Sequence, residues 1–277
     1  MTSTEPQSNT ELELIDAWVN PNQGTRHQPP PVGHLFSDLA ERRRRGTTFP
    51  QLIEEMDAAR VRKAVLCVGY GGYDAVPWMA EAMSTYPDRF AGSINIDPRE
   101  GMAAVRRVTN AVRDHNIRLV RMMALQVQLP YNDAVYYPVY AKCAELGVAV
   151  GLNVGIPGPR VASRHQHPMS IDDVCAFFPE LTVVMSHGGD PWGALCAKLM
   201  LHWDNLYYMS SAYAPKRLPK EIIEYANWRG SDKILWASDY PVLEFERCRR
   251  EILQMPFVKE ETRRKFAYDN ADRMFFN

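Results

Sequence analysis

The sequence has no apolar run long enough to cross a membrane and no closely spaced pair of cysteines. A membrane-spanning helix needs about 18 or more consecutive apolar residues, and the 277 residues contain no such run. The five cysteines are scattered without a C-x-x-C pair: Cys67, Cys143, Cys175, Cys196 and Cys248. An odd, dispersed set is typical of free buried thiols in a reducing compartment. We therefore expect a cytoplasmic protein that does not enter a membrane.

An excess of charge of either sign is also missing. The chain has 32 Lys and Arg against 33 Asp and Glu, a net charge of −1, so it has no general attraction for nucleic acid or an anionic membrane. Its basic run, residues 42–45, follows Glu41 and has no interleaved aromatic residue. We interpret this run as a solvated helix face or as a contact with a second copy of the chain, which makes a homo-oligomer one candidate assembly and a nucleic-acid site improbable.

The first ten residues are polar and lack the apolar centre of a signal peptide. We predict that residues 1–10 form a disordered leader and that residues 11–277 form one domain. A hydrophobic content of 46% is enough for a sizeable core, and barrels of this length routinely form single domains.

Eight apolar segments alternate with helical patterns along the chain. The predicted strands are residues 12–16, 63–68, 90–96, 117–122, 148–154, 181–187, 206–210 and 233–239, and residues 21–48 are predicted to be irregular. Eight repeats of strand and helix close a barrel, and the absence of a G-x-G-x-x-G motif argues against an open, doubly wound sheet. The sequence therefore predicts an α/β protein with a single (β/α)8 TIM-like barrel.

Two of these strands end in a reactive side chain, His187 and Asp239, followed at once by turn residues. The carboxyl ends of barrel strands are where such folds build active sites. Imidazole exchanges protons near pH 7, and a carboxylate at the end of an apolar strand needs a partner or a solvated cleft. We predict that His187 and Asp239 are catalytic. The alternatives are a hydrogen-bonded core histidine and an aspartate paired with a loop arginine.

Further side chains are candidates for substrate binding at the same end. Trp18 and Asn20 share one face of the first strand because alternate residues do so, Arg121 ends the fourth strand and Asn153 the fifth. Arg121 can hold a substrate carboxylate through two parallel hydrogen bonds, or it can form an ion pair with a loop acid. Packing alone would equally explain Trp18.

Loop residues complete the predicted set. His165 and His167 resemble a metal motif, but outside a strand the two rings need not share a side, so a surface loop is the simpler reading, with His167 the better candidate for the pocket. Tyr213 and Tyr240 each follow a strand and can add a phenol to the mouth of the barrel, or can serve packing.

The ordered series of motifs resembles the amidohydrolase-2 branch of the metal-dependent hydrolase superfamily, which includes aminocarboxymuconate semialdehyde decarboxylase and the resorcylate-type decarboxylases. The matching segments are Leu-Ile-Asp-Ala at 14–17, Tyr-Pro-Asp-Arg-Phe at 86–90, Phe-Pro-Glu-Leu through His-Gly-Gly at 178–189, residues 234–241 and Asn-Ala at 270–271. The resemblance implies a barrel enzyme that acts on a small carboxylated, aromatic or cyclic substrate by decarboxylation or hydrolysis.

The ligand set of that family is incomplete in this chain. The resemblance implies four histidines and one aspartate around zinc or a related ion, yet Trp18, Asn20 and Asn153 occupy histidine positions, and only His187 and Asp239 match. Catalytic zinc usually has three protein ligands and water. We therefore expect no metal ligands and no cofactor, with His187 and Asp239 as an acid/base pair. The alternatives are a zinc-dependent hydrolase that uses these two residues as ligands, or a degenerate barrel that only binds a ligand.

Overall fold

The computed structural model describes residues 11–21, 32, 34–67 and 76–277. The predicted leader, residues 1–10, lies outside this part of the chain, as does much of the stretch predicted to be irregular, including Pro29, Pro30 and Pro31.

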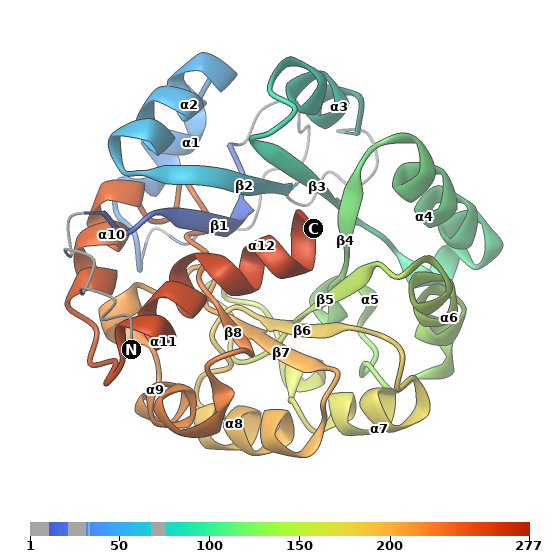
Figure 1. Ribbon diagram of the computed structural model, residues 1–277. Coiled ribbons are helices and arrows are strands. Elements are labelled where there is room, and N and C mark those ends of the chain that lie inside the picture. The colour runs from blue at the N-terminus through green and yellow to red at the C-terminus, as the bar shows by residue number, and fades with distance from the viewer. Residues whose placement is uncertain (1–10, 22–31, 33, 68–75) are drawn as a thin grey trace, which may run out of the picture.

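Eight parallel strands form the centre of the molecule in their order along the chain (Figure 1). They are β1 (Leu14–Val19), β2 (Val61–Cys67), β3 (Phe90–Asn95), β4 (Ile117–Met122), β5 (Ala149–Asn153), β6 (Val183–Ser186), β7 (Leu206–Met209) and β8 (Ile234–Leu235). The ring is completed by a parallel bridge between Val19 and Tyr240 and by the backbone N–H of Asp239, which donates to the carbonyl of Trp18 (2.9 Å). The predicted (β/α)8 barrel is confirmed.

The first and last strands differ from their predicted bounds. β1 begins two residues later than expected and continues to Val19, because its side chains from Leu14 to Val19 are all buried against the core. β8 ends at Leu235, because the backbone beyond it bonds to other partners: the N–H of Trp236 donates to the carbonyl of Phe266, and that of Ala237 donates to Ser210 Oγ. The strand ends that carry the site are therefore shaped by neighbouring segments as well as by the ladder.

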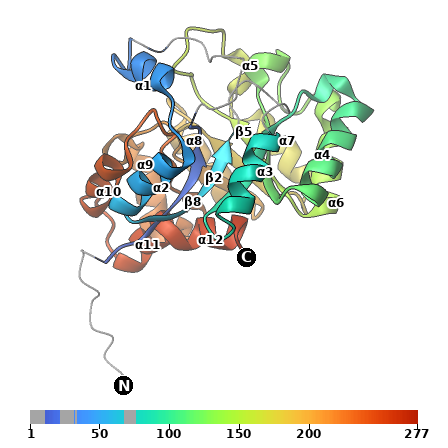
Figure 2. The ribbon, with the colours of Figure 1, turned by 90° about the horizontal axis from the view of Figure 1, so that it is seen from above.

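Helices surround the strands (Figures 1 and 2). They are α1 (Leu39–Arg45), α2 (Phe49–Ala58), α3 (Val76–Thr85), α4 (Met102–Asp114), α5 (Ala124–Val127), α6 (Tyr137–Leu146), α7 (Ser170–Phe177), α8 (Gly193–His202), α9 (Lys220–Tyr225), α10 (Phe245–Leu253), α11 (Glu260–Arg264) and α12 (Asn270–Phe275). Short 3-10 turns are η2 (Pro98–Glu100), η3 (Ala134–Tyr136), η4 (Arg164–Gln166) and η5 (Pro215–Arg217), and π-type turns are η6 (Ala226–Gly230) and η7 (Lys265–Asp269). No helix in the described residues is both long and apolar enough to cross a membrane.

The two ends of the barrel are closed differently. α12 crosses the end at which the strands begin, where Ala271 and Phe275 pack with Ile15, Val65 and Leu119 of the barrel interior (Figure 1). α1 and α5 lie at the opposite end (Figure 2). Since apolar side chains fill the first end, the opening formed by the described residues lies at the end where the strands finish.

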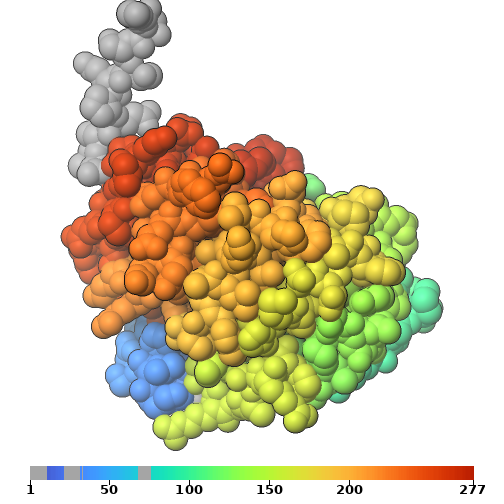
Figure 3. Space-filling model, turned by 90° about the horizontal axis from the view of Figure 1, so that it is seen from below, coloured from blue at the N-terminus to red at the C-terminus, as the bar shows by residue number. Residues whose placement is uncertain are grey.

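α1 lies within the stretch predicted to be irregular, so that prediction was wrong for residues 39–45. Its buried Leu39 fixes it over the barrel, and the side chains of Val32 and Leu35 just before it lie beside Gly158, in the segment after β5. Figure 3 shows the blue atoms of this region against the yellow-green atoms of the segment after β5. These two segments form a roof over the carboxyl end of the barrel.

Candidate active site

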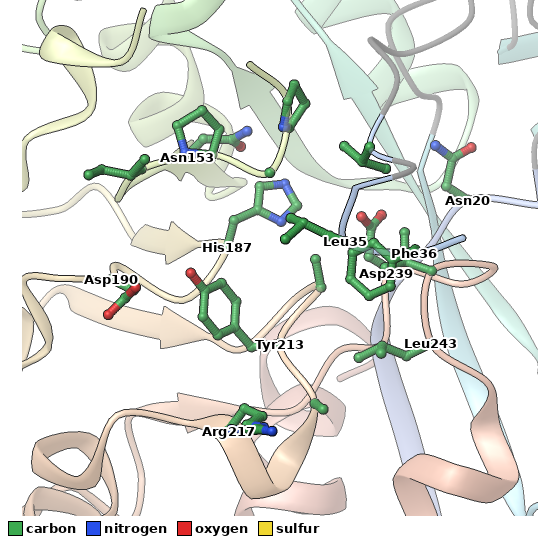
Figure 4. Close-up of a pocket in the computed structure, with 18 of the residues that line it drawn as sticks. Asn20, Leu35, Phe36, Asn153, His187, Asp190, Tyr213, Arg217, Asp239 and Leu243 are labelled. Carbon is green, nitrogen blue, oxygen red and sulfur yellow. The ribbon is translucent and has the colours of Figure 1, made fainter. Parts of the chain in front are cut away.

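A cavity of about 650 Å³ opens at the carboxyl end of the strands, beneath this roof. Figure 4 shows side chains from different strands around it. Six predicted site residues line it: Asn20, Arg121, Asn153, His187, Tyr213 and Asp239. The fold thus gathers into one space residues that are separated by more than 200 positions in the chain.

His187 and Asp239 share an unusual backbone conformation. Their φ angles are +67° and +54°, in the left-handed region that residues other than glycine seldom adopt. Each is fixed by a hydrogen bond, since His187 N–H donates to Ser211 Oγ (3.0 Å) and Asp239 N–H donates to the carbonyl of Trp18. Strain of this kind is typical of functional positions, and here it turns both side chains out of their strand ends toward the cavity (Figure 4).

The His187 ring is anchored through Nδ1 by Ser211. Its Nδ1 lies 3.3 Å from the carbonyl oxygen of Ser211 and 3.0 Å from Ser211 Oγ. In the tautomer that donates Nδ1–H to this carbonyl oxygen, which can only accept, Nε2 keeps a lone pair. Burial, together with the positive charge of Arg121, lowers the pKa of His187 to about 3, against the opposing effect of the Ser211 hydrogen bond. The ring is therefore neutral in the free protein at pH 7.

Asp239 supplies a half-buried carboxyl group to the same cavity. Burial raises its pKa to about 6, although the charges of Arg121 and Arg43 act in the other direction. The site therefore holds a neutral base and a carboxyl group that can lose its proton near neutral pH, and both sense the charge of Arg121.

Trp18 lies below the cavity and does not line it. Its side chain is 1% exposed. Its ring centre lies 4.3 Å from the guanidinium carbon of Arg121 and 5.1 Å from the ring centre of His187, with the two rings edge to face. The sequence left contact with the substrate and plain packing as equal interpretations of Trp18. The structure places Trp18 as a support for two residues that do face the cavity.

Asp16, at the end of the predicted first strand, is buried in the barrel wall. It accepts hydrogen bonds from the N–H groups of Trp18 and Ser238, both at 3.0 Å, and so ties β1 to the segment after β8. Burial raises its pKa to about 7 despite these bonds. Asp16 thus shapes the backbone on either side of the site without reaching the cavity.

Two further candidates lie away from the cavity lining. The ring of His167 packs edge-on against Trp192 at 4.6 Å, and its Nδ1 accepts from the N–H of Met169. The hydroxyl of Tyr240 shares a hydrogen bond with Thr47 (3.0 Å) and its ring stacks on Phe245. Both side chains are used in packing, which the sequence left open for Tyr240, whereas the alternative for His167 was a surface loop.

Several lining residues were missed by the sequence reading. Arg43, Arg217 and Arg247 contribute charge, and Leu35, Phe36 and Leu243 contribute apolar surface. Arg43 belongs to the basic run that we read as a solvated face or subunit contact. None of these residues ends a strand, so strand-end reasoning could not find them.

The donor groups of the cavity fit an oxygen-preferring divalent ion better than zinc. The described residues contain no group of three or more His, Cys, Asp and Glu that could hold a metal. However, Asn153 Oδ1 is buried with no hydrogen-bond partner in the described part of the chain, and it lines the same cavity as Asp239 and His187. Carboxylate, carbonyl and water oxygens suit manganese, whereas zinc favours nitrogen and sulfur.

Comparison with known proteins supports the fold and the family resemblance. The family model Amidohydro_2, described as amidohydrolase, matches residues 15–276. No similar sequence was found among curated proteins.

Solved structures similar to this chain include an uncharacterized TIM-barrel protein from Bordetella bronchiseptica, with 24% identity, 95% of this chain and 98% of the other covered, and a TM-score of 0.76. A second is 5-carboxyvanillate decarboxylase from Novosphingobium aromaticivorans, complexed with manganese and 4-hydroxy-3-methoxy-5-nitrobenzoic acid (15%, 98% of both chains, 0.73). A third is 2,6-dihydroxybenzoate decarboxylase from Rhizobium (15%, 95% and 98%, 0.72).

The manganese in the second structure corrects one expectation. From the missing histidines we inferred that no cofactor is bound, and this inference is contradicted by a protein of the same fold that holds a divalent ion. The physical reason is that histidine is not the only suitable ligand, because manganese accepts oxygen donors. A count of histidines against a zinc pattern was therefore the wrong test.

Proposed function

Since this chain belongs to the amidohydrolase family, we propose that it is a carboxy-lyase that removes the carboxyl group from a small aromatic or cyclic acid. The observation that carries the proposal is the position of Arg121, whose charge acts on both His187 and Asp239 in one cavity. A fixed cation beside two proton-exchanging groups suits a carboxylate that is to be replaced by a proton. The two structurally similar decarboxylases support the same substrate class.

A divalent ion of the manganese type belongs to this proposal. Asp239 and Asn153 Oδ1 would hold it, with Asn20 offering a further carbonyl at the cavity edge. When bound, such an ion polarises substrate oxygen atoms as a Lewis acid.

The protein side chains then have separate tasks. Arg121 binds the reacting carboxylate, and Trp18 holds the guanidinium in place from below. When the carbon–carbon bond breaks, CO2 leaves without the bonding electron pair. The pair remains on the ring carbon, which must then receive a proton, and Nε2 of His187 is the atom placed to deliver it. Burial and, to a smaller extent, the charge of Arg121 lower the pKa of His187. A bound substrate carboxylate offsets the charge of Arg121 and so raises the pKa, which lets the ring take up from water the proton that it delivers. Protonation of the ring is thereby coupled to substrate binding.

Hydrolysis is the second candidate, favoured by the neutral imidazole of the free protein. A ring with a free lone pair on Nε2 can accept a proton from water that attacks an ester, lactone or amide. A barrel that binds without turnover remains the third possibility, and activity measurements decide among the three.

The proposal is tested by incubating the manganese-loaded protein with hydroxylated and methoxylated benzoic acids and measuring released CO2. We expect CO2 from at least one acid, its loss after dialysis against a chelator, and its return with added manganese. Turnover of esters or lactones without CO2 release from any acid would favour hydrolysis. Binding of the acids with no turnover of either class would favour the binding protein.

We further propose a cytoplasmic location, supported by five free cysteines that are all buried, and a small molecule as the main partner. A second copy of the chain is the one macromolecular partner that we propose, and nucleic acid is not, given the balanced charge.

A further inference from the structure

The cavity has positive charge at two separate places. Arg121 lines the cavity together with His187 and Asp239, and its guanidinium lies on the Trp18 ring that also contacts His187. Arg217 and Arg247 line a different part of the wall, which is formed by η5 and α10. Figure 4 shows Arg217 beyond Tyr213, away from His187. A substrate with a single carboxylate, bound at Arg121, would leave Arg217 and Arg247 without an anionic partner in the substrate.

Arg247 is held by a partner that leaves its carboxylate-binding edge available. Its Nε donates to Oε1 of Glu251 (3.0 Å), and Glu251 is only 7% exposed. Lys216 of η5 binds the same carboxylate from the other side (3.3 Å) and so fastens η5 to α10. The bond to Glu251 uses Nε alone, and among the described residues no other hydrogen bond or ion pair of the Arg247 side chain is seen. Its Nη groups can therefore meet a carboxylate from the cavity.

Arg217 has no such partner. Its side chain is exposed and, within the described part of the chain, forms no ion pair, whereas its neighbour Lys216 is engaged by Glu251. An arginine with five donors on a cavity wall is suited to an anionic ligand.

Apolar surface completes the cavity lining. Leu35 and Phe36 come from the roof, and Val242 and Leu243 precede α10. The volume of about 650 Å³ falls within the range of about 300–1,000 Å³ that is typical of small-molecule sites. The lining thus suits a ligand with an apolar body and acidic groups at two places.

We propose that the substrate carries a second acidic group, which Arg217 and Arg247 bind while Arg121 binds the carboxylate that reacts. The inference rests on the proposed function for the role of Arg121 alone. Arg217 and Arg247 are specificity-determining residues: they select a diacid over the corresponding monoacid without touching the reacting atoms.

The test is a comparison of binding by calorimetry, with the full chain loaded with manganese. The probes are benzoate and a series of benzoates with a second carboxylate on a para chain of zero to three carbons. The variants are Arg217→Gln, Arg247→Gln and, as a matched control, Arg250→Gln, which removes the same charge from an exposed position of α10 that does not line the cavity.

We expect the parent to bind the best diacid about tenfold more tightly than benzoate. The binding free energy of a tenfold change in affinity is close to that of one charge-assisted hydrogen bond. Arg217→Gln and Arg247→Gln should each remove most of that advantage and leave benzoate affinity unchanged, whereas Arg250→Gln should change neither. If the parent does not prefer any diacid, or if both cavity variants keep the preference, the proposal is overturned.

Binding distinguishes this inference from the proposed function. If a diacid binds through Arg217 and Arg247 but no acid releases CO2, the second subsite stands and the decarboxylation proposal fails. If a monoacid is decarboxylated and no diacid is preferred, the decarboxylation proposal stands and the second subsite fails.

Discussion

The guanidinium carbon of Arg121 lies 4.3 Å from the centre of the Trp18 ring, and the centre of the same ring lies 5.1 Å from that of His187. A buried aromatic ring thus joins the cation that would bind the substrate to the imidazole that would move the proton. Cation–π contacts of this kind are worth about 2 kcal/mol or more when they are shielded from water. Trp18 is consequently a positioning residue, and its loss should disturb two functions at once.

Replacement of Trp18 tests this role. We expect Trp18→Ala to lower the free energy of unfolding by about 3–5 kcal/mol, because it empties a fully buried site, and to raise KM and lower kcat together. Trp18→Phe keeps a ring beneath Arg121 and should lose much less of both. Urea unfolding and steady-state kinetics measure the two effects. A change in KM alone, equal in both variants, would favour a plain wall residue.

His187 and Asp239 are expected to dominate turnover. His187→Ala should lower kcat by about 10²–10⁴, the range for loss of a proton-transfer group, and Asp239→Asn should do similar damage because an amide keeps the shape of the carboxylate without its charge. Circular dichroism checks that each variant is folded. Near-parental turnover in both would place the chemistry elsewhere in the molecule.

Asp16 predicts a pH dependence of stability. Its folded pKa of about 7 exceeds the unfolded value of about 4, so the folded state holds the proton more tightly. The stability from this group is complete below about pH 4 and is lost as the pH rises to 7, with a total on the order of a few kcal/mol. Asp16→Asn keeps an acceptor oxygen but cannot ionise.

The stability of Asp16→Asn relative to the parent should therefore increase between about pH 4 and 7, as measured by urea unfolding across that range. A difference that stays constant with pH would show that Asp16 does not titrate in this window.

Gly188 sets the position of Tyr213. Its φ is +82°, and a Cβ there would collide with the Tyr213 ring. We expect Gly188→Ala to destabilise the protein by about 1–3 kcal/mol and to raise KM by displacing Tyr213 from the cavity wall. Gly147→Ala is the matched control, since Gly147 also has a positive φ (+62°) but open space around it. It should reduce stability and leave KM unchanged. Equal effects of both variants on KM would contradict the packing argument.

The sequence contained enough to predict the barrel and the strand ends of its site. Apolar runs that end in His187 and Asp239 are local features, and parallel strands bring their carboxyl ends together whatever their separation in the chain. The burial of Trp18 and Asp16 was not predictable from alternation, because alternation gives the side of a strand and not the depth in the barrel.

The cationic wall was also hidden from sequence reasoning. Arg217 and Arg247 belong to a short turn and a helix whose meeting depends on Lys216 and Glu251, 35 residues apart. The missing histidines led us to expect no metal for a chemical reason: a comparison with zinc ligands ignores oxygen donors such as Asn153 Oδ1.

The most direct test of the central claim is to run the decarboxylation in D2O, with the manganese-loaded protein and an acid that it is found to decarboxylate, and to analyse the product by NMR. We predict that CO2 is released in equal amount to product and that one deuterium is found at the ring carbon that lost the carboxyl group. In His187→Ala, the rates of CO2 release and of deuterium incorporation should both fall by about 10²–10⁴-fold. Parental rates of CO2 release and deuterium incorporation in His187→Ala would contradict it.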